Sequence, residues 1–450
     1  MHRAVGNKRE IIGYPESRRV LWRGEPGSDI PKFAPTPACM VRAMTMAKFI
    51  FPAPLLSGLV AAAAVAHAAS PAAEGQAASW LRAWDSQSIH RTATPGDEAG
   101  ATWLAREAAA LGGTVTMESF PLERIDPLAA YIECDGMRIE GEALFDGPDT
   151  AATGVVGPVT DPSGEGLVGV MELSPSDVYG QEYQRMRRES RHRAQVIVTM
   201  GGAPGLALFN AEGFRAPFGP PTVQVSSIER DRVRRALARN VPFRVVVQTK
   251  RTPTHGRNVV VTIAGRDRSR PAVVVMTPRS SWWQSTSERG GGLVCWLETV
   301  RALIAHPPAC DVIFAANTGH ELGHVGLDDF VARRPGWETK ATWIHYGANI
   351  GATGSKLMIM SAQDDLRALA AQHLTRAGQK PDLIADKTTI PTGETKDIHK
   401  TGGRYLTLVA PPSTSPLFHL PQDRWPHAVD VPAIARMAEG MANAVVALTR

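Results

Sequence analysis

Apolar runs with the length of a buried strand alternate with stretches of helical periodicity along the C-terminal half of the chain. A continuous apolar run of about four to eight residues between turn residues is typical of a strand that is covered on both faces. Such strands are predicted at 258–263, 272–276, 312–316, 341–346, 357–360 and 405–409. Helices are predicted at 292–303, 328–333, 363–377 and 431–448. Because strands and helices alternate, we expect an α/β fold with a mostly parallel central sheet flanked by helices.

A different pattern precedes this region. Helices are predicted at 78–85 and 97–111, followed by a strand at 114–120. Beyond them, short strand-like runs separated by Gly, Pro and Asp occur at 154–156, 166–171, 195–199, 206–208, 222–225 and 243–247, with basic helices at 183–193 and 229–239. We therefore predict a small β-rich domain at 128–256, inserted into an α/β domain made of 69–127 and 257–450. The insert shows no catalytic constellation, so we assign it to substrate restriction or scaffolding.

The first 68 residues have the pattern of a targeting segment. A basic residue precedes an apolar run at 49–65, which ends in small residues up to Ala68. This predicts a signal peptide cleaved near Ala68 and an exported protein, periplasmic or secreted. As a membrane anchor, the run would be at the lower limit of about 17–25 residues, and its prolines weaken that interpretation. Because signal peptides begin at the initiator methionine, we expect the true start within 40–46 and an over-extended sequence upstream.

The net charge of the chain is informative only when its distribution along the sequence is considered. The chain has 49 basic and 44 acidic residues, a net charge of +5. Nine basic and four acidic residues lie within 1–68, so the remainder holds 40 of each and is neutral. A nucleic-acid or membrane-binding protein needs a basic excess in its working domains, so we exclude nucleic-acid partners and stable membrane insertion.

Three cysteines follow residue 68, and an odd number excludes a complete disulfide framework. Cys295 and Cys310 are close enough in sequence to pair across a short loop. Cys295 also lies in an apolar helical stretch, where a free core cysteine is equally expected. No CxxC spacing is present, so a cysteine zinc site is not supported.

A polar cluster follows the predicted strand at 312–316. It contains His320, Glu321 and His324, and we expect a helix to resume from Glu321. The string is HExxH, in which two imidazoles on one helical face hold zinc and the glutamate between them activates water. The flanking Gly319 and Gly323 are unusual for that motif. The ends of strands in open α/β sheets are also where ligands are usually bound, which suggests a second interpretation.

The second interpretation comes from motifs in fixed order after residue 257. They are Trp282-Trp283 after a strand, Ser287-Glu-Arg-Gly-Gly-Gly, Gly319-His-Glu-Leu-Gly323, Tyr346-Gly-Ala-Asn-Ile-Gly351 and Phe418-His-Leu-Pro-Gln-Asp423. In order and spacing, this chain resembles the exported zinc aminopeptidase family that includes bacterial leucyl aminopeptidase and, as a one-zinc branch, the glutaminyl cyclases. The resemblance implies that the region at 128–256 corresponds to the family's inserted protease-associated domain.

The resemblance also implies which metal positions are missing. The family's first metal-binding His falls on Pro278, its Asp partner on Ser280, and a later Asp on Ala348. Neither proline nor alanine can bind a metal through its side chain. All groups private to the first metal are thus replaced, so the resemblance implies at most one zinc ion per chain.

At the second metal position, the resemblance retains three ligands. The bridging Asp falls on Glu288, a Glu ligand on Glu321, and the last His on His419. Three protein ligands with an open position for water suit one catalytic zinc ion. The family's general base falls on His320, which can accept a proton near neutral pH or act as a fourth ligand. The HExxH interpretation instead takes His320 and His324 as ligands and Glu321 as the base.

The resemblance places further side chains near the mouth of this site. They are Arg279, Trp282, Trp283 and His345, for which ordinary packing is about as reasonable as substrate binding. The loop at 394–397 lies where the family forms the end of its substrate-binding site, and we assign no specific role to it. A serine nucleophile is not indicated, because no Gly-x-Ser-x-Gly elbow occurs.

The favoured function is hydrolysis of an amide bond in a peptide or small amide with one zinc ion. His320 would relay the proton and Glu321 would be a ligand. Cyclase-type acyl transfer at the same site is a close variant. The main alternative is a metal-free pseudoenzyme that acts as a binding or scaffolding protein, since four site positions have changed. The HExxH hydrolase is a third interpretation.

Overall fold

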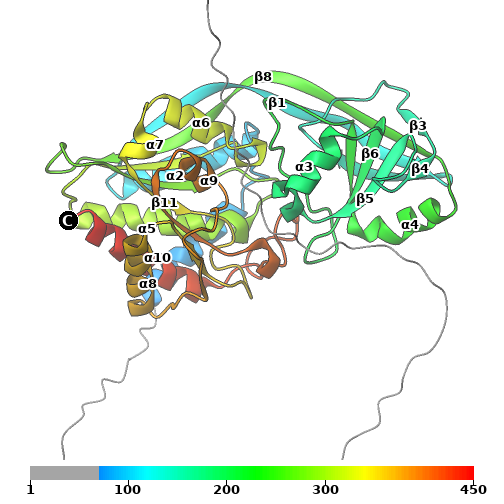
Figure 1. Cartoon of the computed structure of the whole chain (residues 1–450). Coiled ribbons are helices and arrows are strands. Elements are labelled where there is room, and N and C mark those ends of the chain that lie inside the picture. Colours follow the sequence, from blue (N-terminus) through cyan, green and yellow to red (C-terminus); the bar gives the residue numbers. More distant parts are fainter. Residues whose placement is uncertain (1–69) are drawn as a thin grey trace, which may run out of the picture. The chain divides into compact units, whose positions relative to one another are not determined.

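The structure is a computed structural model, and it describes residues 70–450 (Figure 1). The predicted signal peptide and start position lie outside the described residues. The three cysteines of the described part, Cys134, Cys295 and Cys310, are buried and free. The disulfide considered between Cys295 and Cys310 therefore does not form.

The centre of the sheet consists of four parallel strands, in the order β14, β11, β9, β10. Their bounds are Val273–Pro278 for β9, Val312–Asn317 for β10, Thr342–Tyr346 for β11 and Arg404–Val409 for β14. Every residue of β9 and β10 is buried, as expected for strands covered on both faces. Beyond β14, the strand β12 (Met358–Met360) is antiparallel, and β13 (Leu383–Ile384) forms the edge.

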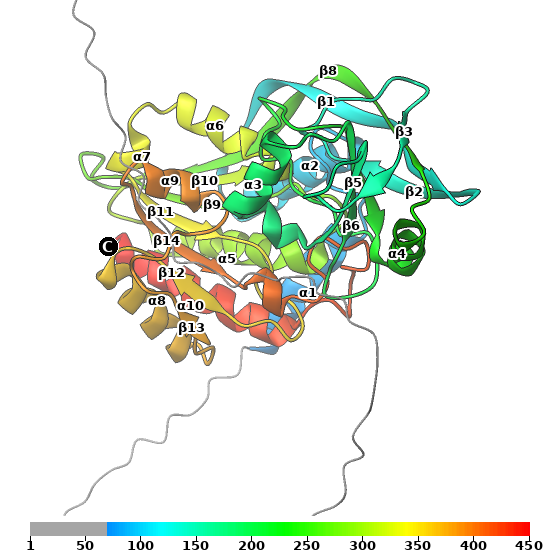
Figure 2. The same ribbon diagram turned by 45° about the vertical axis from the view of Figure 1, so that its right-hand side comes forward.

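Helices cover both faces, and alternate residues of each strand reach opposite sides (Figure 2). In β9, Val273 and Val275 pack with one group of helices, whereas Val274 and Met276 pack with the other. The first group is α1 (Pro71–Asp85), α2 (Pro95–Ala110), α5 (Gly291–Ala305), α8 (Asp364–Arg376) and α10 (Val431–Leu448). The second is α6 (Val325–Ala332), α7 (Trp337–Lys340) and α9 (Thr395–Lys400). The predicted α/β class with a central sheet flanked by helices is confirmed.

The helix α10 closes the fold and packs mainly on α5. It is the one described helix that is long and apolar enough to cross a membrane, but 61% of that span is buried inside the protein. Such burial is typical of a core helix.

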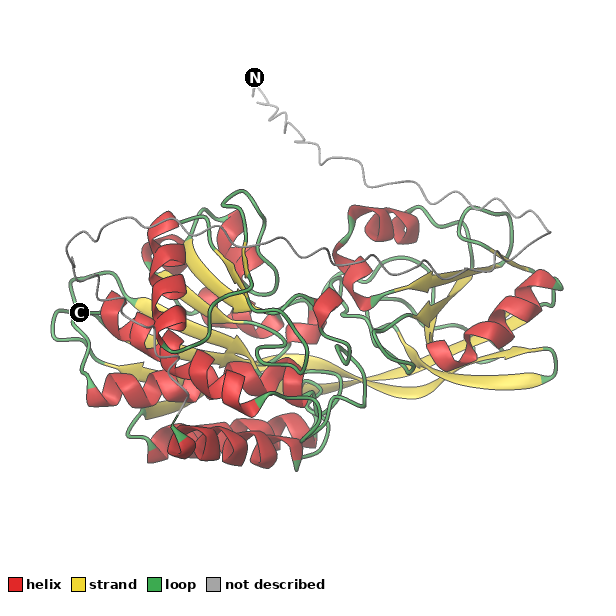
Figure 3. Ribbon diagram, turned by 90° about the horizontal axis from the view of Figure 1, so that it is seen from below, coloured by secondary structure: helices red, strands yellow, loops and turns green. Residues whose placement is uncertain are grey.

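Two long antiparallel strands extend the sheet away from its centre (Figure 3). The strands β1 (Thr114–Cys134) and β8 (Phe243–Ile263) pair along their length, with one shift of register between Pro127 and Ala129. Their far halves carry a second set of strands, which are β2 (Met137–Ala143), β3 (Val155–Gly157), β4 (Val159–Thr160), β5 (Val168–Leu173), β6 (Ala194–Thr199) and β7 (Thr222–Ser226). The predicted limits of the insert at 128 and 256 fall inside these continuous strands, so the division into domains stays a prediction.

The second set of strands is accompanied by α3 (Gln181–Arg188) and α4 (Arg230–Ala238) and by the short helices η1 (Pro175–Tyr179) and η2 (Ser227–Glu229). The strand predicted at 206–208 is absent, because side chains take its backbone donors. The Ala207 amide donates to Thr199 Oγ1, and the Phe209 amide donates to Gln224 Oε1. This loop instead runs towards the centre of the protein, where the Ala211 amide donates to the Glu321 carbonyl oxygen at 2.8 Å.

Candidate active site

The carboxyl ends of β9, β10, β11 and β14 meet at one edge of the sheet, and the loops that follow them carry the predicted functional residues. The short helices η3 (Thr286–Gly290), η4 (His320–Leu322) and η5 (Pro412–Thr414) belong to these loops. Ser285, His324 and His419 have left-handed backbone conformations, with φ of 50°, 64° and 60°. Non-glycine residues adopt this conformation at a cost, and they gather at functional sites. This edge is therefore the candidate active site.

The HExxH string does not lie on one α-helix. Gly319, Gly323 and His324 all have positive φ, so the chain makes a single tight turn at η4, and α6 begins only at Val325. The predicted resumption of the helix from Glu321 is wrong for this reason. The turn still brings the two imidazoles together, with ring centroids of His320 and His324 5.1 Å apart.

A third residue completes a group with metal-binding capacity. The ligand atoms of His320, His324 and Glu394 all lie within 4.8 Å of one another, and all three residues are buried. Among residues 70–450, this is the one group of three or more His, Cys, Asp or Glu side chains that meets this criterion. Glu394 immediately precedes α9, 70 residues after His324 in sequence, so no local spacing indicates it.

His324 has the arrangement of an oriented metal ligand. Its Nδ1 lies 2.7 Å from Asp397 Oδ2, whereas its Nε2 is buried and has no hydrogen-bond partner among the described residues. Burial lowers the pKa of His324, but the hydrogen bond to Asp397 and the charges of Glu394 and Glu212 outweigh it and raise this pKa to about 9. A carboxylate on one imidazole nitrogen fixes the ring so that the other nitrogen can bind a metal.

Glu394 joins two imidazoles. Its Oε1 lies 2.8 Å from His320 Nδ1, and its Oε2 lies 3.1 Å from His345 Nε2. Burial alone would raise the pKa of Glu394, but the neighbouring histidines, above all His320, hold it well below its usual range. Burial lowers the pKa of His320 to about 4 despite the opposing effect of Glu394, so this imidazole is neutral near pH 7. His320 and Glu394 are therefore in the forms that bind zinc, whereas the raised pKa of His324 means that this imidazole has to release a proton when a metal binds.

Gly393 allows this packing. It has a φ of +64°, and a Cβ atom there would lie 3.0 Å from Cε1 of His345 and 4.0 Å from Cε1 of His320. A side chain at 393 would therefore be strained and would press on His345.

Glu288 and His419, two of the ligands that the resemblance implies, lie side by side but contact a third charge. Glu288 Oε1 is 3.3 Å from His419 Nε2 and 2.7 Å from the guanidinium of Arg289, and all three side chains are buried. Burial would raise the pKa of Glu288, but Arg289 and His419 outweigh it and lower this pKa. The Arg289 cation already balances the charge of Glu288, which opposes a metal ion here, although both Glu288 oxygens and His419 Nε2 are buried without a hydrogen-bond partner.

Glu321, the remaining ligand that the resemblance implies, points elsewhere. Its Oε1 accepts hydrogen bonds from the amide and the hydroxyl of Thr92, both at 2.7 Å, and its Oε2 accepts one from Ser280 Oγ at 2.6 Å. This carboxylate ties the loop between α1 and α2 to the end of β9. The structure therefore does not bring Glu288, Glu321 and His419 together as one compact group.

The side chains predicted at the mouth of the site have separate environments. Arg279 is fully buried and pairs with Asp97 Oδ1 at 2.7 Å. Trp282 is buried, donates to Asn210 Oδ1, and packs edge-on against Phe145. Trp283 is half-buried and donates to the His419 carbonyl oxygen at 2.9 Å. Only His345, through Glu394, adjoins the group of His320 and His324.

Functional side chains that the sequence analysis missed come from distant loops. Glu394 and Asp397 lie in the stretch that received no role. In sequence, Glu394 is 74 residues from His320 and 49 from His345, and Asp397 is 73 residues from His324. Glu212 comes from the region assigned to scaffolding, and its charge influences His324. The one usable signal was the clustering of charge at 394–397 in an otherwise polar loop.

The buried His90 makes the stability of this region depend on pH. Its ring stacks on Trp84 at a centroid distance of 3.5 Å, and burial lowers the pKa of His90 from 6.5 to about 3. Between these pH values, the unfolded chain binds more protons than the folded protein. The stability contributed by neutral His90 is thus fully present above about pH 6.5 and is lost as the pH falls towards 3.

We therefore expect His90→Asn to flatten the fall in the free energy of unfolding between about pH 6.5 and pH 4, by an amount on the order of a few kcal/mol. Asparagine can keep the hydrogen bond to the Gln284 carbonyl oxygen that Nδ1 now makes. Urea unfolding at several pH values measures the slope, and His427→Asn, at an exposed position, is the control. An unchanged slope in His90→Asn would contradict the assignment.

Comparison with solved structures reveals similar folds. A zinc aminopeptidase from Bacillus subtilis matches with a TM-score of 0.67 and 14% sequence identity, over 84% of this chain and 95% of that chain. A peptidase M28 precursor from Shewanella amazonensis matches with a TM-score of 0.67 and 15% identity, over the same shares. An aminopeptidase from Aneurinibacillus sp. strain AM-1 matches with a TM-score of 0.61 and 14% identity, over 84% and 93%.

Neither a family model nor a curated protein sequence matches this chain. The similarity to the solved structures therefore concerns the fold, which is that of zinc aminopeptidases. The resemblance inferred from the order of the motifs is confirmed at this level.

Proposed function

We propose that this protein is a peptidase-like amide hydrolase that works with one zinc ion held by His320, His324 and Glu394. The fold is similar to that of proteins whose names describe zinc aminopeptidases, which supports a peptide or small amide as substrate. The observation that carries the proposal is the buried imidazole of His324. Its Nδ1 is fixed by Asp397 while its Nε2 lacks a partner, and it lies beside a second imidazole and a carboxylate.

Two imidazole nitrogens and one carboxylate oxygen form a common donor set for catalytic zinc. When bound, zinc would polarise the amide carbonyl and lower the pKa of water. The protein supplies the orientation of the ligands. Asp397 holds the ring of His324, and Glu394 holds the rings of His320 and His345. The low pKa of Glu394 keeps this carboxylate charged across the neutral range.

We assign the acceptance of a proton from the attacking water to Glu212. Its Oε1 is buried and has no partner among residues 70–450, and its Oε2 lies 3.6 Å from the ammonium of Lys396. A general base needs a free carboxylate oxygen near the reacting water. This role replaces the relay through His320, because His320 Nδ1 is engaged with Glu394. Glu321 is unsuited to it, since Thr92 and Ser280 occupy its oxygens.

A second candidate function is that of a metal-free binding or scaffolding protein. The specific observation in its favour is Arg289, whose guanidinium lies 2.7 Å from Glu288 at the position where the resemblance implies a metal. A buried cation that balances the charge of a former ligand would be expected in a relative that has lost its metal.

The test is the metal content of the purified protein, followed by an assay of amide hydrolysis. We expect about one zinc ion per chain by elemental mass spectrometry, and hydrolysis of amino-acid anilides that stops with a chelator and returns with zinc. Identification of the products separates hydrolysis from cyclase-type acyl transfer. A protein that takes up no zinc and cleaves no amide would support the binding protein instead.

We also propose that the protein is exported. The support is the predicted signal peptide, which precedes the described residues. N-terminal sequencing of the protein recovered outside the cytoplasm should find a start near residue 69, and recovery of the intact N-terminus would contradict export.

A further inference from the structure

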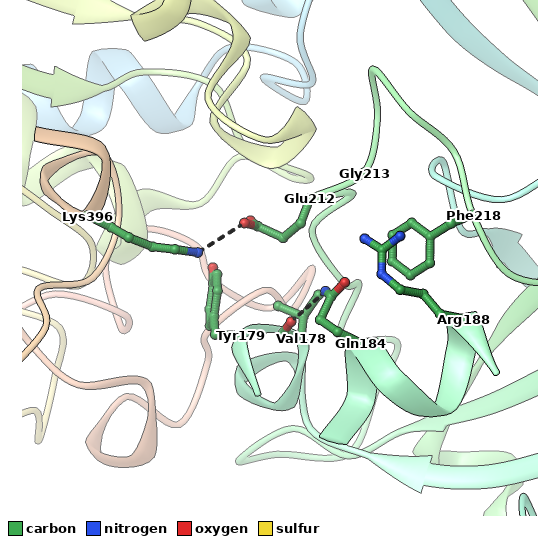
Figure 4. A pocket seen from close by; sticks show the side chains of 8 residues that line it. All are labelled: Val178, Tyr179, Gln184, Arg188, Glu212, Gly213, Phe218 and Lys396. Atoms are coloured by element: carbon green, nitrogen blue, oxygen red, sulfur yellow. Dashed lines mark hydrogen bonds and ion pairs between the residues drawn. The ribbon is translucent and has the colours of Figure 1, made fainter. Parts of the chain in front are cut away.

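A pocket of about 210 Å³ lies between the helices η1 and α3 and the start of α9 (Figure 4). Its walls include Tyr179, Arg188, Glu212, Phe218 and Lys396. Figure 4 shows Lys396 and Arg188 on opposite sides, with Glu212 between them. The volume is below the roughly 300–1,000 Å³ of a typical small-molecule site, so it suits one residue of a peptide rather than a larger ligand.

The charges of this pocket do not cancel. The Lys396 ammonium is 3.6 Å from Glu212 Oε2 and 5.7 Å from the centroid of the Tyr179 ring, so it is balanced. The Arg188 guanidinium stacks over Phe218 at 4.1 Å from the ring centroid. Arg188 has no acidic partner in the described part of the chain, which leaves one positive charge for a ligand.

The pocket adjoins the proposed zinc ligands. Lys396 lies two residues after Glu394 and one before Asp397, which holds His324. Glu212 lies against the turn that carries the histidines, since the amide of the preceding Ala211 donates to the Glu321 carbonyl oxygen at 2.8 Å and a Cβ atom at Gly323 would lie 2.9 Å from the Glu212 carbonyl oxygen. A peptide residue in this pocket would therefore be next to the bond that is cleaved.

We propose that this pocket binds a carboxylate of the peptide substrate and that Arg188 is its main partner. A guanidinium can form two parallel hydrogen bonds with a carboxylate, and stacking on Phe218 holds its plane in place. The carboxylate can come from an acidic side chain or from the C-terminus. This inference rests on the proposed peptidase function and adds a substrate class to it.

The test compares four short peptides that share an N-terminal alanine and differ in the second side chain or in the C-terminal group. They are Ala-Glu amide, Ala-Ala with a free C-terminus, Ala-Ala amide and Ala-Lys amide. Binding is measured by calorimetry and cleavage by chromatography, with the full chain loaded with zinc. We expect at least one carboxylate peptide to bind about two- to fivefold more tightly than Ala-Ala amide, the upper part of the range for an exposed ion pair. Comparing the first two peptides distinguishes a side-chain carboxylate from a terminal one.

Variants of α3 locate the contact. Arg188→Gln should remove the preference, and Arg188→Glu should transfer it to Ala-Lys amide. Arg185→Gln is the matched control, because Arg185 is on the same helix, is exposed, and pairs with Glu189 rather than lining the pocket. Equal loss of preference in Arg185→Gln and Arg188→Gln would overturn the inference, since it would reflect net charge alone.

The two proposals fail in different ways. If the carboxylate peptides bind through Arg188 but no peptide is cleaved, the hydrolase is contradicted and the carboxylate pocket stands. If all four peptides are cleaved with equal KM, the hydrolase stands and the pocket is overturned. If no peptide binds or is cleaved, both are overturned.

Discussion

Replacing His324 with alanine is expected to reduce the zinc content from about one ion per chain to less than about a tenth, and to abolish amide hydrolysis. The reason is geometric. His324 Nε2 and His419 Nε2 are both buried without a hydrogen-bond partner, but only His324 has a carboxylate, Asp397, on its other nitrogen, whereas His419 Nδ1 contacts the Leu208 carbonyl oxygen. Elemental mass spectrometry after dialysis measures the loss, and urea unfolding of the same variant checks that the fold remains.

Three further variants sharpen this prediction. Asp397→Asn should weaken zinc binding by about 10- to 100-fold, as expected when the group that orients a ligand is lost. Glu288→Gln should leave the zinc content unchanged, because Arg289 already balances that carboxylate. His427→Ala removes an imidazole at an exposed position and is the matched control. Loss of zinc in Glu288→Gln with retention in His324→Ala would favour the ligands that the family resemblance implies.

Replacing Arg279 with methionine is expected to lower the free energy of unfolding by about 3–5 kcal/mol, because it leaves a buried carboxylate without its counter-ion. Arg279 is fully buried and pairs with Asp97 Oδ1 at 2.7 Å, and it also donates to the Arg257 carbonyl oxygen at 2.7 Å. Burial already raises the pKa of Asp97 even with Arg279 present. Urea unfolding near neutral pH measures the change.

The double variant Arg279→Met, Asp97→Asn removes both charges and should recover much of the loss. This recovery separates a structural ion pair from a role in substrate binding. If Arg279→Met keeps full stability but raises KM, the sequence-based assignment of Arg279 to the substrate would be restored.

The apolar pattern predicted the centre of the fold well. The helix predicted at 431–448 has these bounds in α10, and the strand predicted at 405–409 differs from β14 by one residue. Both are buried elements whose own sequence carries the signal. The long strand β1 was predicted only over 114–120, and β8 only at its two ends, because residues 248–257 are polar and partly exposed. Pairing between chain segments more than 100 residues apart holds this stretch extended, and no local pattern shows that pairing.

The sequence predicted where the candidate site lies but not which side chains meet there. The pattern placed His320 and His324 directly after the strand at 312–316, which is where the structure has them. The direction of each side chain depends on the tight turn between Gly319 and His324, in which Glu321 points towards Thr92. Glu394 and Asp397 reach the histidines from the start of α9, which is distant in sequence, so only the folded chain reveals these contacts.

Arg289 makes the charge balance of one corner of the site independent of the supply of metal. Its guanidinium is covalently part of the chain, and it keeps its charge at every physiological pH. The corner of the site formed by Glu288 and His419 therefore remains electrically balanced during metal starvation, without the repulsion that an empty cluster of carboxylates would suffer. This corner therefore does not depend on a bound metal ion for its charge balance or its shape.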